Sequence, residues 1–235
     1  GSGLPTRPTI APLLLLALLA VSLAVRFIAV RDLAFPPWVD SSRHALITAV
    51  MVESGRAPDG YEPYLPIEGF PYHFGFHTLS AGLALMTGWP LPGLLLTLGQ
   101  LHNGLMPLAV YAAGRLATGR RSVGLVAAFF VALPSFFPGY YATWGRMTQI
   151  PAMFILCVLL ALTWRLGRGW ARLWPLVGVL AAGLFLVHFR VFLFYLPFAA
   201  LLGAGQLVRL ARGRDHASGF GPLLMAAGLA LLLVM

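Results

Sequence analysis

The sequence predicts an all-α polytopic membrane protein with about seven transmembrane helices, and its composition carries this prediction. Of the 235 residues, 59% are apolar and only 10% are charged, whereas roughly a quarter of the residues in a soluble domain are charged. Several apolar runs approach or exceed the roughly 20 residues that cross a bilayer as a helix. So much apolar surface excludes both an ordinary soluble domain and a disordered chain.

Charge and cysteine content exclude other classes of protein. All sixteen basic residues are arginine, and the formal net charge is +9. Because arginines of membrane proteins concentrate in cytoplasmic loops, we expect no nucleic-acid partner. The single cysteine, Cys157, excludes a disulfide framework and a thiolate metal cluster. Residues 1–235 form one predicted module, in which Gly1-Ser2-Gly3 resembles a cloning remnant, and we expect the natural chain to continue beyond Met235.

Seven apolar runs are predicted to span the membrane: 9–30, 91–117, 122–138, 149–166, 173–187, 191–209 and 220–235. An eighth run, 74–88, is short for a span. If it crossed the membrane, three clusters of arginines would lie outside, against the positive-inside rule. If it lies on the surface, all three clusters lie inside with Arg7, and this topology is predicted. The clusters are Arg115/Arg120/Arg121, Arg165/Arg168/Arg172 and Arg209/Arg212/Arg214.

Residues 31–90 then form one large external loop that contains two membrane-surface helices. Two consecutive prolines end the first span, and an Asp-Ser-Ser triplet begins the first surface helix, at 40–54, whose apolar positions share one face. Residues 55–72 have the proline and glycine content of a loop. The run 74–88 is predicted to be the second surface helix.

The positions of the carboxylates limit which functions the chain can carry out. Six of the seven acidic residues fall within 32–68, and none occurs from 69 to 214. Any carboxylate chemistry therefore belongs to the external loop. Proton- and cation-coupled transporters place carboxylates within their spans, so a transporter is the less favoured alternative.

Three short strings, together with the order of spans and surface helices, carry a resemblance to a known superfamily. They are Asp40-Ser-Ser-Arg-His44, Tyr72-His-Phe-Gly-Phe-His77 and Trp144-Gly-Arg-Met-Thr-Gln149. This pattern resembles bacterial members of the GT-C superfamily of integral membrane glycosyltransferases, which use polyprenyl-phosphate-linked sugars as donors. Ser41 departs from the pattern, because many relatives carry a second acid there.

The resemblance implies a hexosyl- or pentosyltransferase of the cell envelope. Its active site would face the external side of a bacterial inner membrane. Its partners would be a polyprenyl-phosphate or -pyrophosphate sugar donor, membrane lipids and an unidentified acceptor. A non-catalytic lipid-binding or assembly protein on the same scaffold is the alternative from another class.

A sugar-phosphate donor has a stable leaving group, so one carboxylate that deprotonates the acceptor hydroxyl suffices, and displacement with inversion is expected. Asp40 is the candidate catalytic base, and the alternative is that it only caps the surface helix. Glu68, close before the Tyr72–His77 string, is a second candidate site carboxylate.

Arg146 and Arg190 are predicted to converge on one lipid-linked phosphate near Asp40, because the guanidinium binds phosphate bidentately. The alternative is ordinary contact with lipid headgroups. His188 would assist Arg190, and Gln149, at the start of a span, would bind sugar hydroxyls.

Histidines recur at a spacing of four residues in the external loop. His44 lies one helical turn after Asp40, and His73 and His77 share the same spacing. These four side chains could bind a divalent metal ion. The alternative is that the histidines donate hydrogen bonds to substrate or headgroups.

Overall fold

The computed structural model describes residues 10–67, 69–70, 72–135, 139–213 and 219–235. All regular secondary structure within these residues is helical. The helices are α1 (Ala11–Val30), α2 (Val39–Ser54), α3 (Gly75–Thr87), α4 (Leu91–Thr118), α5 (Arg121–Ala132), α6 (Gly139–Thr143), α7 (Gln149–Gly167), α8 (Trp174–Val187), α9 (Phe189–Ala211) and α10 (Phe220–Val234), with a 3₁₀ turn at Ala171–Leu173.

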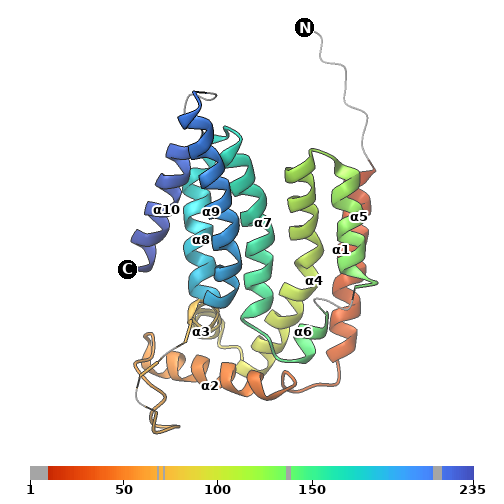
Figure 1. Ribbon diagram of the computed structural model, residues 1–235. Coiled ribbons are helices and arrows are strands. Elements are labelled where there is room, and N and C mark those ends of the chain that lie inside the picture. Colours follow the sequence, from red (N-terminus) through yellow and green to blue (C-terminus); the bar gives the residue numbers. More distant parts are fainter. Residues whose placement is uncertain (1–9, 68, 71, 136–138, 214–218) are drawn as a thin grey trace.

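The long helices stand side by side as a bundle, and α2 lies across one end of it with α3 and α6 nearby (Figure 1). The connections α4–α5, α7–α8 and α9–α10 lie at the opposite end (Figure 1). These connections carry the predicted arginine clusters, of which Arg214 lies outside the described residues. The clusters therefore share one end of the bundle, and the segment of α2 and α3 occupies the other, as the sequence predicts.

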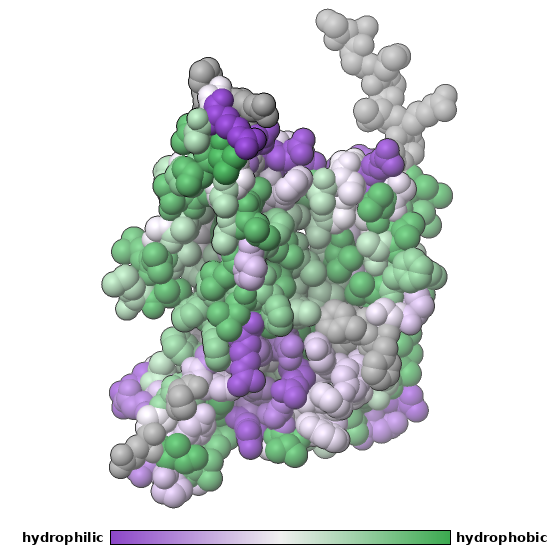
Figure 2. Space-filling model, in the orientation of Figure 1, coloured by the Kyte–Doolittle hydropathy of each residue, from purple (hydrophilic) through white to green (hydrophobic). Residues whose placement is uncertain are grey.

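Among the residues that the structure describes, three helices are long and apolar enough to cross a membrane, namely α1, α7 and α9. Three further segments, 121–132, 171–187 and 220–234, are apolar but shorter. On the face shown in Figure 2, the surface of the bundle between its two polar ends is largely hydrophobic. This distribution is typical of a membrane protein.

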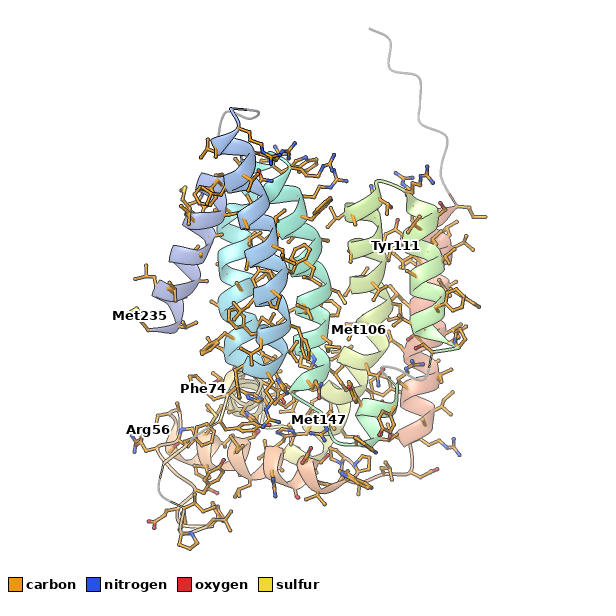
Figure 3. All side chains as sticks on the ribbon, viewed as in Figure 1. Arg56, Phe74, Met106, Tyr111, Met147 and Met235 are labelled. Atoms are coloured by element: carbon orange, nitrogen blue, oxygen red, sulfur yellow. The ribbon has the colours of Figure 1, made fainter. Side chains whose placement is uncertain are left out.

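The bundle is packed around α4 and α7. The side chains of Leu159, Leu166, Val177, Leu184 and Val191 form one core between α7, α8 and α9. Met106 and Ile150 join α4 to α7 in a second core. Nearer α2, Met147 is fully buried against α4, and a Cβ on Gly99 would lie 2.6 Å from its sulfur (Figure 3).

The predicted span 122–138 is wrong at its carboxyl end, because α5 ends at Ala132. Leu133 leaves the helical conformation before Pro134, whose ring disfavours the α region in the preceding residue. The free Ala132 carbonyl accepts a hydrogen bond of 2.8 Å from the buried guanidinium of Arg26 in α1. The other long runs are confirmed as helices within two residues of their predicted ends.

The helices predicted at 40–54 and 74–88 are observed as α2 and α3, with ends shifted by one residue. Both end in a left-handed glycine, Gly55 and Gly88, which terminates the helix without steric strain. Ile47 and Met51 on α2 pack against Ala81 on α3 in a small core of their own. The two helices therefore form one structural unit at the end of the bundle.

Candidate active site

The start of α2 packs directly against the turn between α6 and α7. Gly145 in this turn has a φ of +65°, and a Cβ there would collide with the Ser41 hydroxyl and lie 2.9 Å from the Ser41 nitrogen. Ser41 is fully buried and donates a hydrogen bond of 2.6 Å to the Pro37 carbonyl. The packing thus requires a glycine at 145 and a small residue at 41. It leaves no room for the second acid that the resemblance would place there.

This contact brings Asp40 to Arg146. Their side chains form an ion pair of 3.0 Å between Asp40 Oδ2 and Arg146 Nη1, and the Asp40 side chain is 27% exposed. The alternative that Asp40 only caps the surface helix is wrong, because α2 begins at Val39 and has no side-chain hydrogen bond at its cap. Asp40 lies instead in the first turn, where the helix dipole stabilises an ionised carboxylate.

A second close contact joins α3 to the end of α8. A Cβ on Gly75 would lie 2.9 to 3.0 Å from backbone atoms of Leu186 and Val187, so only glycine permits this approach. As a result, the rings of His73 and His188 lie 4.4 Å apart between their centroids. The His188 ring is held at the start of α9, because its Nδ1 accepts a hydrogen bond of 3.3 Å from the Val191 N–H.

Thr148 connects the two contacts. Its hydroxyl lies 3.2 Å from His73 Nε2 and is buried, two residues after Arg146. The ring of Tyr72 stacks on the other side of the cluster, 3.9 Å from the His73 ring. The turns before α3 and α7 are therefore held together by polar side chains rather than by apolar packing alone.

His44 on α2 and His77 on α3 form a buried pair. His44 Nδ1 lies 3.0 Å from His77 Nε2, so one ring donates and the other accepts. Within the described residues, the Nδ1 atoms of His73 and His77 are buried and have no hydrogen-bond partner. Buried polar atoms are usually satisfied, and the His77 ring is fully buried beside the His73 backbone, so the Nδ1 of His73 is the one a ligand could engage.

Burial keeps these four imidazoles neutral at physiological pH. It lowers the pKa of His44 to about 4, although the charge of Asp40 opposes this change. Burial and the neighbouring histidines lower the pKa of His73 to about 3 and that of His77 well below its ordinary value. Burial, together with the charges of Arg190 and Arg146, lowers the pKa of His188 to about 4.

The residues considered for a metal ion are not arranged around one point. Asp40 pairs with Arg146, His44 and His77 bond to each other, and His73 faces Thr148. No group of three His, Cys, Asp or Glu side chains within the described part of the chain is arranged to hold a metal ion. A metal requirement therefore stays a prediction that no contact supports.

The remaining candidates occupy different positions around this cluster. Arg190 is exposed in the first turn of α9, and its charge acts on both His73 and His188. Gln149 is half-buried and begins α7. Glu68 lies outside the described residues.

Arg146 is already paired in the structure, because Asp40 compensates its charge. Arg146 and Arg190 both lie close enough to His188 for their charges to lower its pKa. Their convergence on one phosphate stays a prediction.

Sequence reasoning missed the residues that position the site. Gly145 and Gly75 were not recognised, although each lies inside one of the strings that carried the resemblance. Trp38 and Trp144, whose rings stack 6.1 Å apart beside the ion pair, were not recognised either. The available signal was a glycine inside each string, between Trp144 and Arg146 in one and between two phenylalanines in the other.

No model of a known protein family matches the chain, and no curated protein matches it significantly. What the site does is therefore inferred from its own residues.

Proposed function

We propose that the protein is a membrane glycosyltransferase of GT-C type, which transfers a sugar from a polyprenyl-phosphate or -pyrophosphate donor to an acceptor. The observation that carries this proposal is the partly exposed ion pair between Asp40 and Arg146 at the end of the bundle. A carboxylate that can take a proton and a guanidinium that can bind phosphate lie side by side there. The charges of both groups act on His44, and that of Arg146 also acts on His188.

The proposal includes a topology of seven spans. Each of the seven apolar runs contains a helix of the bundle, although α5 is shorter than its run, and the arginine-bearing connections share one end (Figure 1). Placing that end in the cytoplasm satisfies the positive-inside rule. The α2–α3 unit then lies on the outer surface of a bacterial inner membrane, where the active site would operate.

The chemistry needs one base and one anion-binding group. Asp40 would accept the proton of the acceptor hydroxyl as its oxygen forms a bond to the anomeric carbon of the donor. The bond from that carbon to the phosphate oxygen breaks, and the phosphate leaves with the electron pair. Arginine stabilises the leaving phosphate by charge and by two parallel hydrogen bonds. The displacement inverts the anomeric carbon.

The ion pair suggests how the donor prepares the base. Without substrate, Arg146 compensates the charge of Asp40. The phosphate of the donor carries one negative charge as a phosphodiester and two as a pyrophosphate, and it can accept two parallel hydrogen bonds from the guanidinium, so it competes with Asp40 for Arg146. The freed carboxylate could then accept a hydrogen bond from the acceptor hydroxyl.

The neutral histidines would act as hydrogen-bonding groups rather than as cations. Because burial keeps His73 and His77 uncharged, they do not repel the two arginines at neutral pH. The unpartnered Nδ1 of His73 could bond to a sugar hydroxyl.

One feature also fits the alternative of a non-catalytic lipid-binding protein. An apolar groove of about 490 Å³ lies between α8, α9 and α10, and it is lined by residues such as Phe185, Phe192 and Leu223. A prenyl or acyl chain would fit such a groove in either function. Lipid binding alone therefore does not separate the two.

The test is donor turnover by the protein in proteoliposomes. A panel of radiolabelled polyprenyl-phosphate hexoses and pentoses is supplied outside, with a cell-envelope extract as the source of acceptor. Release of free polyprenyl phosphate with transfer of label to the extract supports a glycosyltransferase. Saturable donor binding without turnover would support the lipid-binding alternative, and entry of label into the vesicles would support a transporter.

A further inference from the structure

Trp38 adopts a backbone conformation that its residue type rarely adopts. Its φ of 76° and ψ of 161° fall in a region that is essentially reserved for glycine, and it is the only non-glycine residue with positive φ in the described part of the chain. The Trp38 carbonyl accepts a hydrogen bond of 3.2 Å from the Ser41 N–H. Such strained residues persist where the surrounding structure fixes them, and they cluster at binding sites.

The strain presents an indole ring beside the ion pair. Trp38 is 61% exposed, and its ring lies nearly parallel to that of Trp144, at 14° and 6.1 Å between centroids. Trp144 is held from other sides by Tyr140, at 4.3 Å, and by the guanidinium of Arg146, at 5.7 Å. Trp38 is therefore the outer, accessible member of an aromatic stack whose inner member is fixed.

The two turns that meet here carry the same arrangement of side chains. Trp38 precedes Asp40 by two residues, and Trp144 precedes Arg146 by two residues. Because the turn at Gly145 packs directly against Ser41, the aromatic pair and the ion pair lie next to each other. A flat apolar surface thus borders one carboxylate and one guanidinium, both partly exposed.

This combination of groups matches the surface of a sugar ring. A pyranose has one face of C–H groups and a rim of hydroxyls. The negative face of an indole attracts polarised hydrogens, and Asp40 can accept hydrogen bonds from hydroxyls at the rim. A tryptophan that only contacts lipid headgroups has no need of a strained backbone.

We propose that Trp38 is a stacking platform for a pyranose ring of the acceptor, which identifies the acceptor as a carbohydrate. The assignment to the acceptor rests on the proposed function, in which Asp40 deprotonates the acceptor hydroxyl. Binding of the sugar itself does not depend on transfer.

The experiment measures binding of methyl α- and β-pyranosides of glucose, galactose and mannose to the protein in nanodiscs, by saturation-transfer NMR. We compare wild type with Trp38→Phe, Trp38→Gly and Trp89→Ala. Trp89 is an exposed tryptophan before α4, which makes it the matched control. Glycine suits the backbone conformation at position 38, so the folded state should keep or gain thermal stability in Trp38→Gly.

At least one pyranoside should bind, with the strongest transfer to the C–H protons of one face. Trp38→Gly should weaken that binding roughly three- to tenfold, as expected for loss of an aromatic contact. Trp38→Phe and Trp89→Ala should retain most of it. The proposal is overturned if no pyranoside binds, if Trp38→Gly binds like wild type, or if Trp89→Ala loses binding equally.

Asp40→Asn separates this proposal from the proposed function, because it should abolish transfer and retain stacking. Pyranoside binding that depends on Trp38, without turnover of any donor, would refute the glycosyltransferase function but not the role of Trp38 in sugar binding. Turnover with the same acceptor KM in wild type and Trp38→Gly would refute the platform alone.

Discussion

Gly145→Ala is expected to destabilise the protein more than a left-handed glycine alone would require. An alanine at a positive φ costs about 1–2 kcal/mol of folding free energy. At position 145, the new Cβ also meets the Ser41 hydroxyl and lies 2.9 Å from the Ser41 nitrogen and 3.0 Å from the Pro37 carbonyl oxygen. Overpacking of this kind costs about 1–3 kcal/mol more. The expected loss is therefore about 2–5 kcal/mol.

The chain offers a matched control. Gly55 has nearly the same φ, +67°, but its Cβ would meet nothing within 4 Å. Gly55→Ala should cost only the backbone strain, and the difference between the two variants isolates the collision with the start of α2. For a chain of this size, each 1 kcal/mol corresponds to about 2–4 °C in Tm. Thermal unfolding in nanodiscs measures both variants.

The collision should also be relieved in part by its partner. Ser41→Ala removes the hydroxyl but leaves the backbone nitrogen in place, so it should rescue part of the loss in the Gly145→Ala background. Equal destabilisation by Gly55→Ala and Gly145→Ala, with no coupling to position 41, would refute the close packing of the turn at Gly145 against the start of α2.

Three further predictions test topology, anion binding and the histidine cluster. In a Cys157→Ser background, cysteines at positions 58 and 118 should label from opposite sides of the membrane, and labelling from one side would contradict the seven-span topology. Arg146→Lys and Arg190→Lys should each weaken donor binding although the charge is kept, because lysine lacks the bidentate fork; donor affinity equal to wild type would assign them to headgroup contact. Because His44, His73 and His188 have folded-state pKa values of about 3 to 4, below the usual 6.5, the unfolded chain binds more protons in this window, and stability should fall as pH drops from 6.5 to 4. Over this pH range the Tm of a His44→Gln variant should fall less than that of wild type. An equal fall would show that protonation of His44 does not contribute to the loss of stability.

The fold could be predicted largely from the sequence, because its signals are local. Apolar runs, prolines and the loop composition of 55–72 located the helices, and the arginine clusters placed three connections at one end. The early end of α5 was missed because the apolar run continues through Leu133 and past Pro134. A hydropathy pattern does not register a helix that stops inside it.

The candidate site could be predicted only as a set of residues. Asp40, Arg146, His44, His73, His77 and His188 were all named, and the structure brings them into one cluster. Arg146 was predicted to lie near Asp40, but the direct ion pair between them and the contact of His73 with His188 were not foreseen, because they join turns more than 100 residues apart. Gly145 against Ser41 and Gly75 against Leu186 create those contacts, and a sequence does not show which glycine meets which backbone.

Donor turnover by Asp40→Asn tests the central claim most directly. Asparagine keeps the shape of the side chain but does not accept the proton of a hydroxyl, so turnover should fall roughly 10²–10⁴-fold. Asp59→Asn is the matched control, because Asp59 is exposed in the same segment and forms its own ion pair with Arg56, at 2.6 Å. The account predicts near-wild-type turnover for Asp59→Asn and loss for Asp40→Asn, whereas near-wild-type turnover in Asp40→Asn would contradict it.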